Sequence, residues 1–254
     1  MGTAIAAIGT AEAFPPAMAD ALRIVAPYTY TVIFAYRGNE RPLDLFDDFP
    51  GSKRRVFVTD YQEGPYLLDP FYLAATRPVS PGLYRLRDFA PDRFYQGEYF
   101  RSYYEKTGLA EEIGFFVELT GGVMVVLSLM REDRVFSSRE FRALDAFRPV
   151  VDACLRRHWA SLPARFAPPR RASDSPPKNR IERSFQAFAE GQLTPREREI
   201  VEYTLKGHSA EAMGRILGIA PGTVRIHRRN IYAKLRISSQ GELFSNFIQT
   251  MGAA

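Results

Sequence analysis

Apolar residues recur along the chain with two periods, which divide it into a mixed N-terminal part and a helical C-terminal part. β-Branched and aromatic residues dominate segment 28–36, and a second short strand over 42–46 can pair back across the Gly-containing turn that follows it. Largely apolar segments 112–119 and 123–131 flank Thr120-Gly121-Gly122. Such runs, bounded by turn residues, predict two antiparallel strand pairs. Helical spacing of apolar residues instead predicts helices over 11–26, 53–61, 66–76, 97–106 and 138–159.

The order of these elements predicts an α+β fold. A helix, a strand pair, a helical insert, a second strand pair and a long helix are typical of one antiparallel sheet with helices packed around it. Segment 163–180 then contains five prolines and few apolar residues, so we expect a semi-extended linker. The expected organisation is a first domain over residues 1–162, this linker, and a helical domain over 181–254.

Helix start and stop signals are dense in the C-terminal part. Thr194–Glu197 forms a capping box with Pro195 at the first helical position, and Ser209 begins a second helix that Gly218 ends. A third helix is expected over 221–235, and Ser239–Glu242 is a second capping box that opens a fourth. Two helices that are joined by a tight Gly-containing turn, with basic residues on the second helix, are typical of helix-turn-helix DNA-binding domains.

This stretch resembles the C-terminal DNA-binding domain of LuxR-type (GerE- or FixJ-like) bacterial transcription regulators. The resemblance implies double-stranded operator DNA and RNA polymerase as partners. The matching residues are Leu193-Thr194-Pro195-Arg196-Glu197-Arg198-Glu199, Gly214, Leu217-Gly218-Ile219, Gly222-Thr223-Val224, His227, Asn230-Ile231-Tyr232, Lys234-Leu235 and Glu242-Leu243.

The third helix of this stretch is the expected reading helix. If Val224 and Ile231 turn inward, then Arg225 and Arg229 lie outward, one turn apart, where arginine pairs with guanine in the major groove. Ile226 is placed to contact a thymine methyl group, although a structural role for it also fits. In the family, the positions that match Arg225, Ile226 and Arg229 carry base contacts. Expected phosphate contacts are Thr223, His227 (for which a structural role is the alternative), Arg228 and Lys234.

Three residues depart from the family pattern around this helix. Ala220 replaces a capping Ser or Thr, which costs about 1 kcal/mol of helix stability. Arg228 replaces an inward aliphatic residue, and we expect its head group to reach a phosphate. Arg236 replaces the glycine that usually ends the helix in a left-handed conformation, at a cost of about 1 kcal/mol.

Charge is distributed unevenly along the chain. From Arg170 onward there are 14 Lys and Arg against 8 Asp and Glu, whereas the preceding residues are nearly neutral, so the basic character suits a C-terminal domain that meets phosphates. A single cysteine and three scattered histidines predict no disulfide, metal or cofactor. Without a secretory signal or a long apolar run, we expect a soluble, cytoplasmic protein. The sequence has no Ser/His/Asp or Cys/His constellation and no phosphate-binding Gly loop, so we do not expect an enzyme.

In the N-terminal part, Phe57, Tyr61, Asp69-Pro70 and Tyr84 follow one another at spacings of four, eight and fifteen. This pattern is similar to that of the ligand-sensing domain of acyl-homoserine lactone receptors, a GAF/PAS-like α/β/α sandwich. The resemblance implies that Asp69 anchors a polar ligand group, Tyr61 and Tyr84 form hydrogen-bonding walls, and Phe57 forms an apolar wall. Aromatic residues replace both tryptophans of the pattern, which argues against a standard acyl-homoserine lactone and favours an orphan receptor. Membership of an ordinary core is the alternative for all four residues.

The fourth helix carries apolar residues beyond those that a small domain needs. Leu243, Phe244 and Phe247 are expected to form a two-fold contact in a homodimer, as the resemblance implies, while others complete the core. The leading hypothesis is a one-component regulator that binds a small molecule in its first domain and promoter DNA in its second. The alternative is a ligand-independent DNA binder whose N-terminal domain only dimerises or docks a protein partner.

Overall fold

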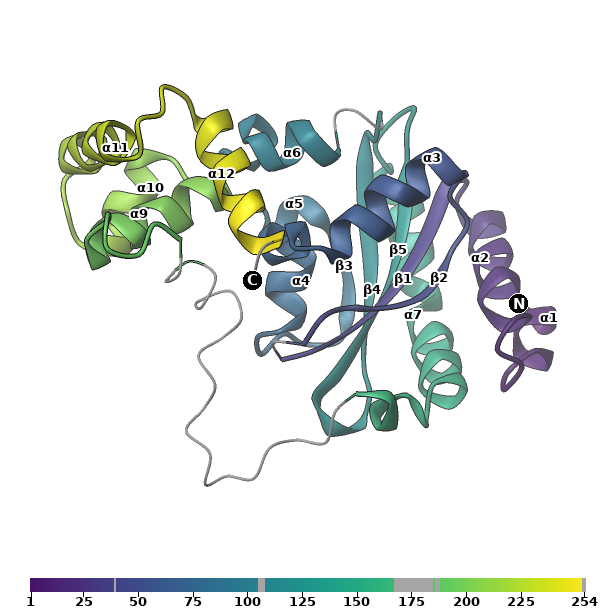
Figure 1. The fold of residues 1–254 in the computed structure, drawn as a ribbon. Coiled ribbons are helices and arrows are strands. Elements are labelled where there is room, and N and C mark those ends of the chain that lie inside the picture. Colours follow the sequence, from purple (N-terminus) through teal and green to yellow (C-terminus); the bar gives the residue numbers. More distant parts are fainter. Residues whose placement is uncertain (39, 105–107, 167–184, 186–187, 253–254) are drawn as a thin grey trace.

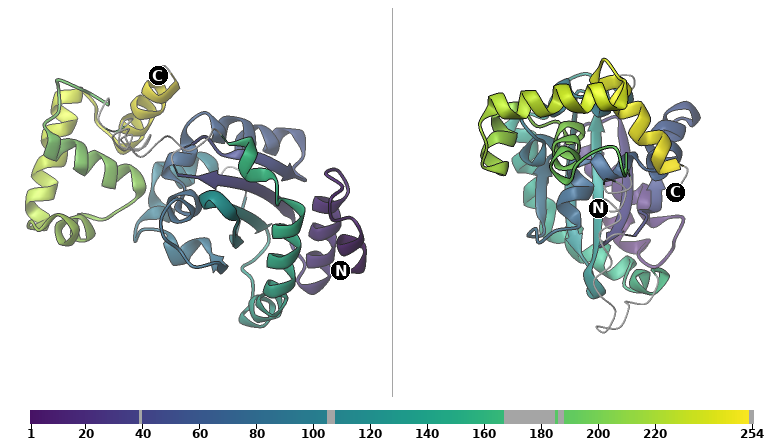
Figure 2. Two further views of the ribbon diagram at one scale, coloured as in Figure 1. Left: turned by 90° about the horizontal axis from the view of Figure 1, so that it is seen from below. Right: turned by 60° about the vertical axis from the view of Figure 1, so that its left-hand side comes forward.

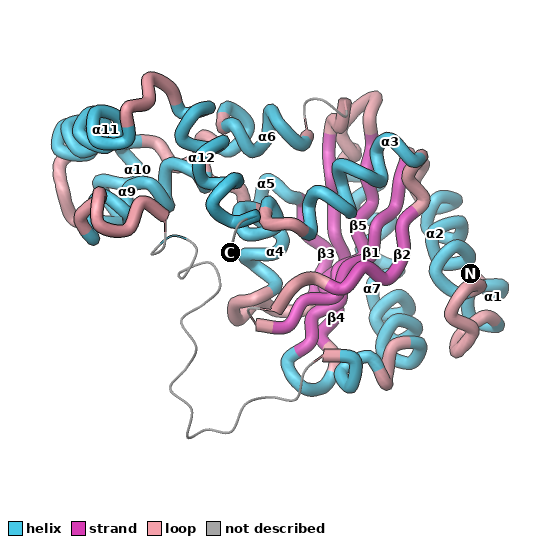
Figure 3. The backbone as a smooth tube through the Cα atoms, viewed as in Figure 1, coloured by secondary structure: helices cyan, strands magenta, loops and turns pink. Residues whose placement is uncertain are grey.

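A computed structural model describes residues 1–38, 40–104, 108–166, 185 and 188–252. Its centre is an antiparallel sheet in the order β2-β1-β5-β4-β3 (Figures 1 and 3). The strands are β1 (Tyr30–Arg37), β2 (Leu43–Asp47), β3 (Gly82–Arg85), β4 (Glu111–Glu118) and β5 (Val123–Arg131). Both predicted strand pairs are present, and β1 pairs with β5 to join them into one sheet. The predicted α+β class is therefore confirmed.

One face of the sheet is covered by helices from both ends of the N-terminal part. These are α1 (Gly2–Ala6), α2 (Phe14–Val25) and α7 (Ser138–His158). Helix α7 begins at a capping box in which Ser137 and Glu140 each accept a hydrogen bond from the other's backbone amide. Apolar side chains of α2 and α7 form one core with Ile33 and Leu127, which point to this face from β1 and β5. Burial of these side chains holds the two helices on the sheet.

The other face is covered by the short helices of the predicted helical insert. These are α3 (Gly51–Arg54), the π-helical turn η1 (Arg55–Asp60), η2 (Pro65–Leu68), α4 (Pro70–Ala75), α5 (Leu86–Phe89), η3 (Phe94–Gln96) and α6 (Glu98–Tyr103). They pack on the side chains that β1 and β5 direct to this face, among them Val32, Phe34 and Val126. Two helix layers with a sheet between them form the expected α/β/α sandwich (Figure 2).

The insert differs locally from its predicted form. The helix expected over 53–61 is a short α-helix that widens into a π-helical turn. The helix expected over 66–76 is interrupted at Asp69, whose extended backbone ends η2 and whose side chain caps α4. Helix α1 is not predicted from the pattern, because its apolar residues form too short a periodic run. The break at Asp69 places a carboxyl group beneath the sheet.

The C-terminal helices begin at the predicted residues, and the last of them extends three residues beyond its expected end near Gln249. They are α9 (Pro195–Lys206), α10 (Ala210–Leu217), α11 (Pro221–Leu235) and α12 (Gln240–Gly252). The Thr194–Glu197 capping box is formed, and Gly207 and Gly218 end α9 and α10 in left-handed conformations. At α12, however, the Glu242 carboxylate accepts from the Ser238 amide at 2.9 Å rather than from that of Ser239. No described helix is long and apolar enough to cross a membrane.

The predicted linker lies mostly outside the described residues. Its first residues belong to η6 (Leu162–Arg165), and residues 167–180 are not described. We refer below to residues 1–166 as the N-terminal unit and to the described residues from 185 to 252 as the C-terminal unit. Figures 1 and 2 show the C-terminal unit at one end of the molecule, beyond α6 and opposite α1 and α2.

Candidate DNA-binding helix and ligand cavity

Helix α11 presents a basic face to solvent. Val224 and Ile231 are fully buried against the helices α9 and α10, which fixes the rotation of α11 about its axis. Arg225 and Arg229 are exposed on the opposite side, one helical turn apart, and Ile226 between them is 51% exposed. An isoleucine this exposed contributes little to the core, which favours the contact role over the structural one.

Arg225 is held by a neighbouring helix. Its guanidinium forms an ion pair with the Glu211 carboxylate of α10, and both side chains are largely exposed. An exposed pair of this kind contributes little to stability, so it orients the arginine at small cost and can be exchanged for a base.

The expected phosphate-contacting residues have different surroundings. The Lys234 ammonium donates to both carboxylate oxygens of Glu197, at 2.8 and 2.7 Å. Because Glu197 also completes the Thr194 capping box, Lys234 ties the end of α11 to the start of α9. Thr223 and His227 also lie on α11, and His227 is half-buried.

The two ends of α11 carry the unfavourable features that Ala220 and Arg236 predict. Ala220 occupies the N-cap position and supplies no side-chain hydrogen bond to the first turn. Arg236 ends the helix in a left-handed conformation with φ of 53°, where a side chain is unfavourable. The helix retains its full length despite both features because packing of Val224 and Ile231 stabilises it.

A small cavity lies between the sheet and the helical insert of the N-terminal unit. Its open space is about 20 Å³. Phe57, Tyr61 and Asp69, three of the four predicted ligand residues, line it together. The other lining residues come from the sheet and from α6 and its C-terminal end, and they are Val32, Phe34, Tyr36, Tyr99, Tyr104, Glu112, Ser128 and Met130.

Asp69 is the centre of a buried polar network at one side of this cavity. Its Oδ2 accepts a hydrogen bond from the Tyr61 hydroxyl at 2.6 Å, and its Oδ1 accepts from the Phe71 amide at 2.9 Å. The hydroxyls of Tyr61 and Tyr36 lie 3.2 Å apart. Burial raises the pKa of the Asp69 carboxyl, and these hydrogen bonds only partly offset that effect.

A second buried carboxyl group, which sequence reasoning missed, faces the same cavity. Glu112 on β4 is 6% exposed, and its Oε2 accepts from the Tyr104 hydroxyl at 3.0 Å. Burial raises its pKa, and the charge of Asp69 raises it further. The available signal was a glutamate at the start of a strand whose next residues are all apolar. Glu111 and Glu112 are adjacent, and only the register of β4 shows which one points into the cavity.

Tyr84 does not line this cavity. It lies on β3, where its ring packs against Phe89 and Phe116 with centroids 4.9 and 5.4 Å away. Its hydroxyl donates to the Ser80 carbonyl oxygen at 2.8 Å. The structure therefore brings Phe57, Tyr61 and Asp69 together and leaves Tyr84 in the adjacent apolar cluster.

The two units meet at a short junction. The Arg93 amide donates to the Gly207 carbonyl oxygen at 2.9 Å, and the Ser209 amide donates to Asp92 Oδ1 at 3.0 Å. A Cβ atom on Gly207 would lie only 2.8 Å from the Phe94 Cα, so this close approach requires glycine. A polar cleft of about 430 Å³ lies beside the junction, and Arg228 contributes to its wall.

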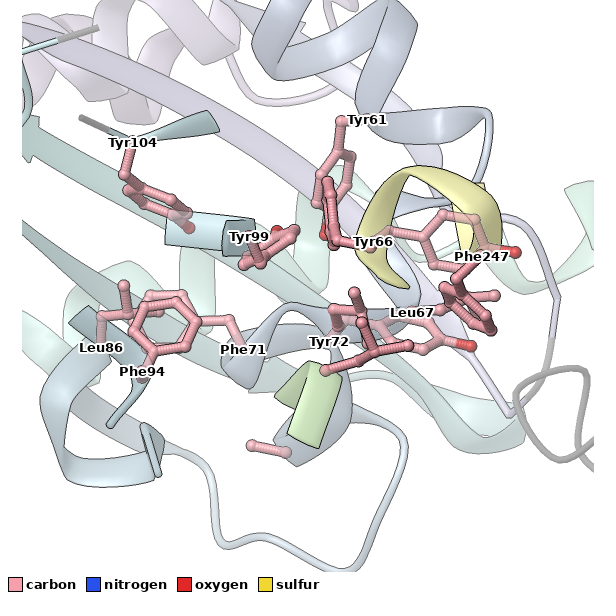
Figure 4. Packing of buried hydrophobic residues seen from close by; sticks show 14 of the residues in the cluster. Tyr61, Tyr66, Leu67, Phe71, Tyr72, Leu86, Phe94, Tyr99, Tyr104 and Phe247 are labelled. Atoms are coloured by element: carbon pink, nitrogen blue, oxygen red, sulfur yellow. The ribbon is translucent and has the colours of Figure 1, made fainter. Parts of the chain in front are cut away.

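The residues expected at a dimer contact are buried within the chain in this arrangement. Leu243, Phe244 and Phe247 are each at most 7% exposed. Phe247 stacks on Phe185 with ring centroids 4.5 Å apart. It also belongs to the same apolar cluster as Tyr66 of the N-terminal unit (Figure 4). Helix α12 packs against α6 as well, so the N-terminal unit covers part of it.

Comparison with known proteins agrees with this architecture. Residues 191–246 match the family described as bacterial regulatory proteins, luxR family. A putative HTH-type transcriptional regulator in the exeN 3′ region of Aeromonas salmonicida is 32% identical over 183 residues, covering 71% of this chain and 93% of that protein. The transcriptional activator protein PhzR of Pseudomonas fluorescens is 29% identical over 127 residues, covering 50% of this chain and 44% of PhzR.

Among solved structures, the N-terminal unit is similar to the VqsR LBD domain from Pseudomonas aeruginosa. The TM-score is 0.54 at 26% sequence identity, and the match covers 63% of this chain and 93% of that one.

Proposed function

The chain belongs to the luxR family of bacterial transcription regulators, and we propose that it is a one-component regulator that binds promoter DNA through α11 and a small-molecule signal in the N-terminal cavity. The proposed domains are a sensing and dimerisation domain over 1–162, a linker over 163–180 and a DNA-binding domain over 181–254. A homodimer that contacts RNA polymerase completes the proposal.

One observation carries the DNA-binding part of this proposal. Helix α11 is the second helix of a helix-turn-helix, and it exposes Arg225, Ile226 and Arg229 on one face while Val224 and Ile231 anchor the other. Two arginines one turn apart can reach successive base edges in the major groove, and an exposed isoleucine suits a thymine methyl group. Arg228 and Thr223 are proposed to contact phosphates, with His227 and Lys234 near them.

The sensing part of the proposal is supported by the cavity and by the likeness to a domain named as an LBD. Phe57, Tyr61 and Asp69 combine an aromatic wall with a buried hydrogen-bonding network, which is the usual composition of a small-molecule site. The replacement of both tryptophans of the receptor pattern favours a ligand other than a standard acyl-homoserine lactone.

Selection from a random DNA library tests the DNA-binding proposal. Repeated rounds with the full chain are expected to enrich one sequence motif. If the protein binds as a dimer, the motif should appear as two inverted half-sites whose centres lie about 10 base pairs apart. Enrichment of no motif would contradict the proposal.

A thermal-shift screen of the full chain against a metabolite library separates sensing from the alternative, in which the N-terminal unit only dimerises or docks a protein. A ligand that raises the melting temperature of the wild type and loses this effect in Tyr61→Phe supports sensing. Stabilisation that is the same in both proteins would place the ligand elsewhere. A screen without any stabilising compound would favour the docking alternative.

A further inference from the structure

The N-terminal cavity holds two carboxyl groups, and none of the described residues that line it is basic. We propose that it is a receptor site for a protonated amine, whose ammonium group binds between Asp69 and Glu112. This inference rests on the proposed function, because it names the chemical class of the signal that the cavity receives.

Among the residues that the structure describes, no basic side chain forms an ion pair with either carboxyl group. Asp69 is 5% and Glu112 6% exposed, so neither is solvated well by water. The side chains that hydrogen-bond to them carry hydroxyl groups, Tyr61 for Asp69 and Tyr104 for Glu112. Hydroxyls lower the cost of a buried carboxylate only in part, and a hydrogen-bonded cation offsets more of it. An ammonium group would supply the missing positive charge and several hydrogen-bond donors at once.

The remaining walls also suit a cation. The rings of Phe57 and Tyr104 meet edge to face with centroids 6.1 Å apart, and Tyr99 lies 6.0 Å from Tyr104. Figure 4 shows Tyr99, Tyr104 and Tyr61 gathered around the same space. Aromatic faces attract cations through their quadrupoles, and this attraction grows when water is excluded. The cavity therefore combines carboxyl groups and aromatic side chains, both of which attract an ammonium group.

Glu112 distinguishes this class of ligand from a neutral one. A neutral ligand with an amide N–H needs one acceptor, which Asp69 already provides. When such a ligand binds, Glu112 is either ionised, which leaves a buried charge unpaired, or protonated, which makes it neutral. A cationic ligand would interact with both groups through charge as well as through hydrogen bonds.

The size of the cavity limits what binds without rearrangement. An open space of about 20 Å³ accepts a group the size of a water molecule, which is also the size of an ammonium head group. The body of the ligand must displace part of the aromatic wall. Tyr99 belongs to α6, which packs against α12 of the C-terminal unit. Displacement of Tyr99 would therefore be transmitted through α6 to α12 of the C-terminal unit.

Titration calorimetry with paired probes tests the inference on the full chain. Phenethylammonium and n-butylammonium chloride are compared with 2-phenylethanol and butan-1-ol, their neutral counterparts, at constant chloride concentration. The variant is Glu112→Gln, which keeps shape and hydrogen bonding but cannot carry the charge. The control is Glu118→Gln, an exposed glutamate on the same strand. Near-ultraviolet circular dichroism confirms that both variants are folded.

At least one ammonium probe is expected to bind saturably, about tenfold or more tightly than its alcohol. Glu112→Gln should lose about tenfold of this affinity or more, and Glu118→Gln none. Equal binding of amine and alcohol, unchanged affinity in Glu112→Gln, or no saturable binding of either amine would each overturn the inference. DNA-motif selection does not depend on these results. Binding of a neutral ligand would therefore refute the proposed amine specificity without refuting the proposed function as a DNA-binding regulator.

Discussion

The backbone amide of Arg93 donates a 2.9 Å hydrogen bond to the carbonyl oxygen of Gly207, and this bond joins the two units of the chain. Gly207 ends α9 with φ of 92° and approaches Phe94 so closely that no side chain fits. The N-terminal unit thereby contacts the DNA-binding helices directly, in addition to the covalent link between them. A change at the cavity wall on α6 has a short path to those helices through this junction.

Replacement of Gly207 by alanine is expected to open the junction. Two effects add, because a left-handed alanine costs about 1 kcal/mol and the new Cβ meets Phe94. Amide hydrogen exchange at Arg93 and Ser209, followed on the full chain, should become faster in Gly207→Ala than in the wild type.

Gly218→Ala is the matched control for this substitution. Gly218 also ends a helix in a left-handed conformation, with φ of 67°, but a Cβ atom added to it would meet no described atom within 4 Å. It should lose a similar amount of stability, about 1 kcal/mol, while Arg93 and Ser209 keep their protection. Equal loss of protection in both variants would show that the close approach to Phe94 is unimportant.

The unfavourable end of α11 gives a prediction for stability. Arg236→Gly is expected to stabilise the C-terminal unit by about 1 kcal/mol, because glycine adopts the left-handed conformation without penalty. Ala220→Ser should add about 1 kcal/mol by supplying the missing N-cap hydrogen bond. Urea denaturation followed by circular dichroism measures both effects. A lower midpoint in Arg236→Gly would contradict this account of the helix end.

The buried carboxyl groups predict how stability depends on pH. Burial, and then the charge of Asp69, raise the pKa of Glu112 from 4.5 to about 8. Between these values the unfolded chain gives up this proton while the folded chain retains it, so the free energy of unfolding falls as pH rises. Among the described residues, the groups that interact with Glu112 are Asp69, the Ser128 hydroxyl and the phenols of Tyr36, Tyr95 and Tyr104.

Comparison with Glu112→Gln isolates this contribution. Wild type should lose about 1.4 kcal/mol for each unit of pKa difference over the window from about pH 5 to about pH 8, relative to a variant that lacks the titrating group. Melting temperatures of both proteins across this window give the difference. If melting temperature depends on pH in the same way in both proteins, the pKa of Glu112 is not raised by burial or by Asp69.

Local signals explain why the C-terminal helices could be predicted from sequence. Thr194, Ser209 and Gly218 act on their own helix ends through hydrogen bonds and φ preferences that depend on nearby residues only. Arg225 and Arg229 followed from the rotation that Val224 and Ile231 impose. These inferences required no knowledge of distant contacts.

The cavity depended on contacts that sequence spacing does not contain. Glu112 enters it because β4 pairs with β5 in one particular register, and a shift by one residue would have turned Glu111 inward instead. Tyr84 matched the receptor spacing, yet β3 directs it to the cluster of Phe89 and Phe116. The burial of Phe247 between the units was also beyond prediction, because it depends on how the units meet.

The most direct test of the account is the specificity of DNA binding with and without the two exposed arginines of α11. Fluorescence anisotropy would give the affinity of wild type and of the Arg225→Ala, Arg229→Ala double variant for the selected site and for a scrambled duplex at one salt concentration. Arg139→Ala, an exposed arginine on α7, is the control.

Each arginine should contribute about 1–3 kcal/mol of discrimination. The double variant is therefore expected to bind both duplexes with similar affinity, whereas the wild type and Arg139→Ala retain their preference for the selected site. An unchanged preference in the double variant would contradict the claim that α11 reads DNA sequence.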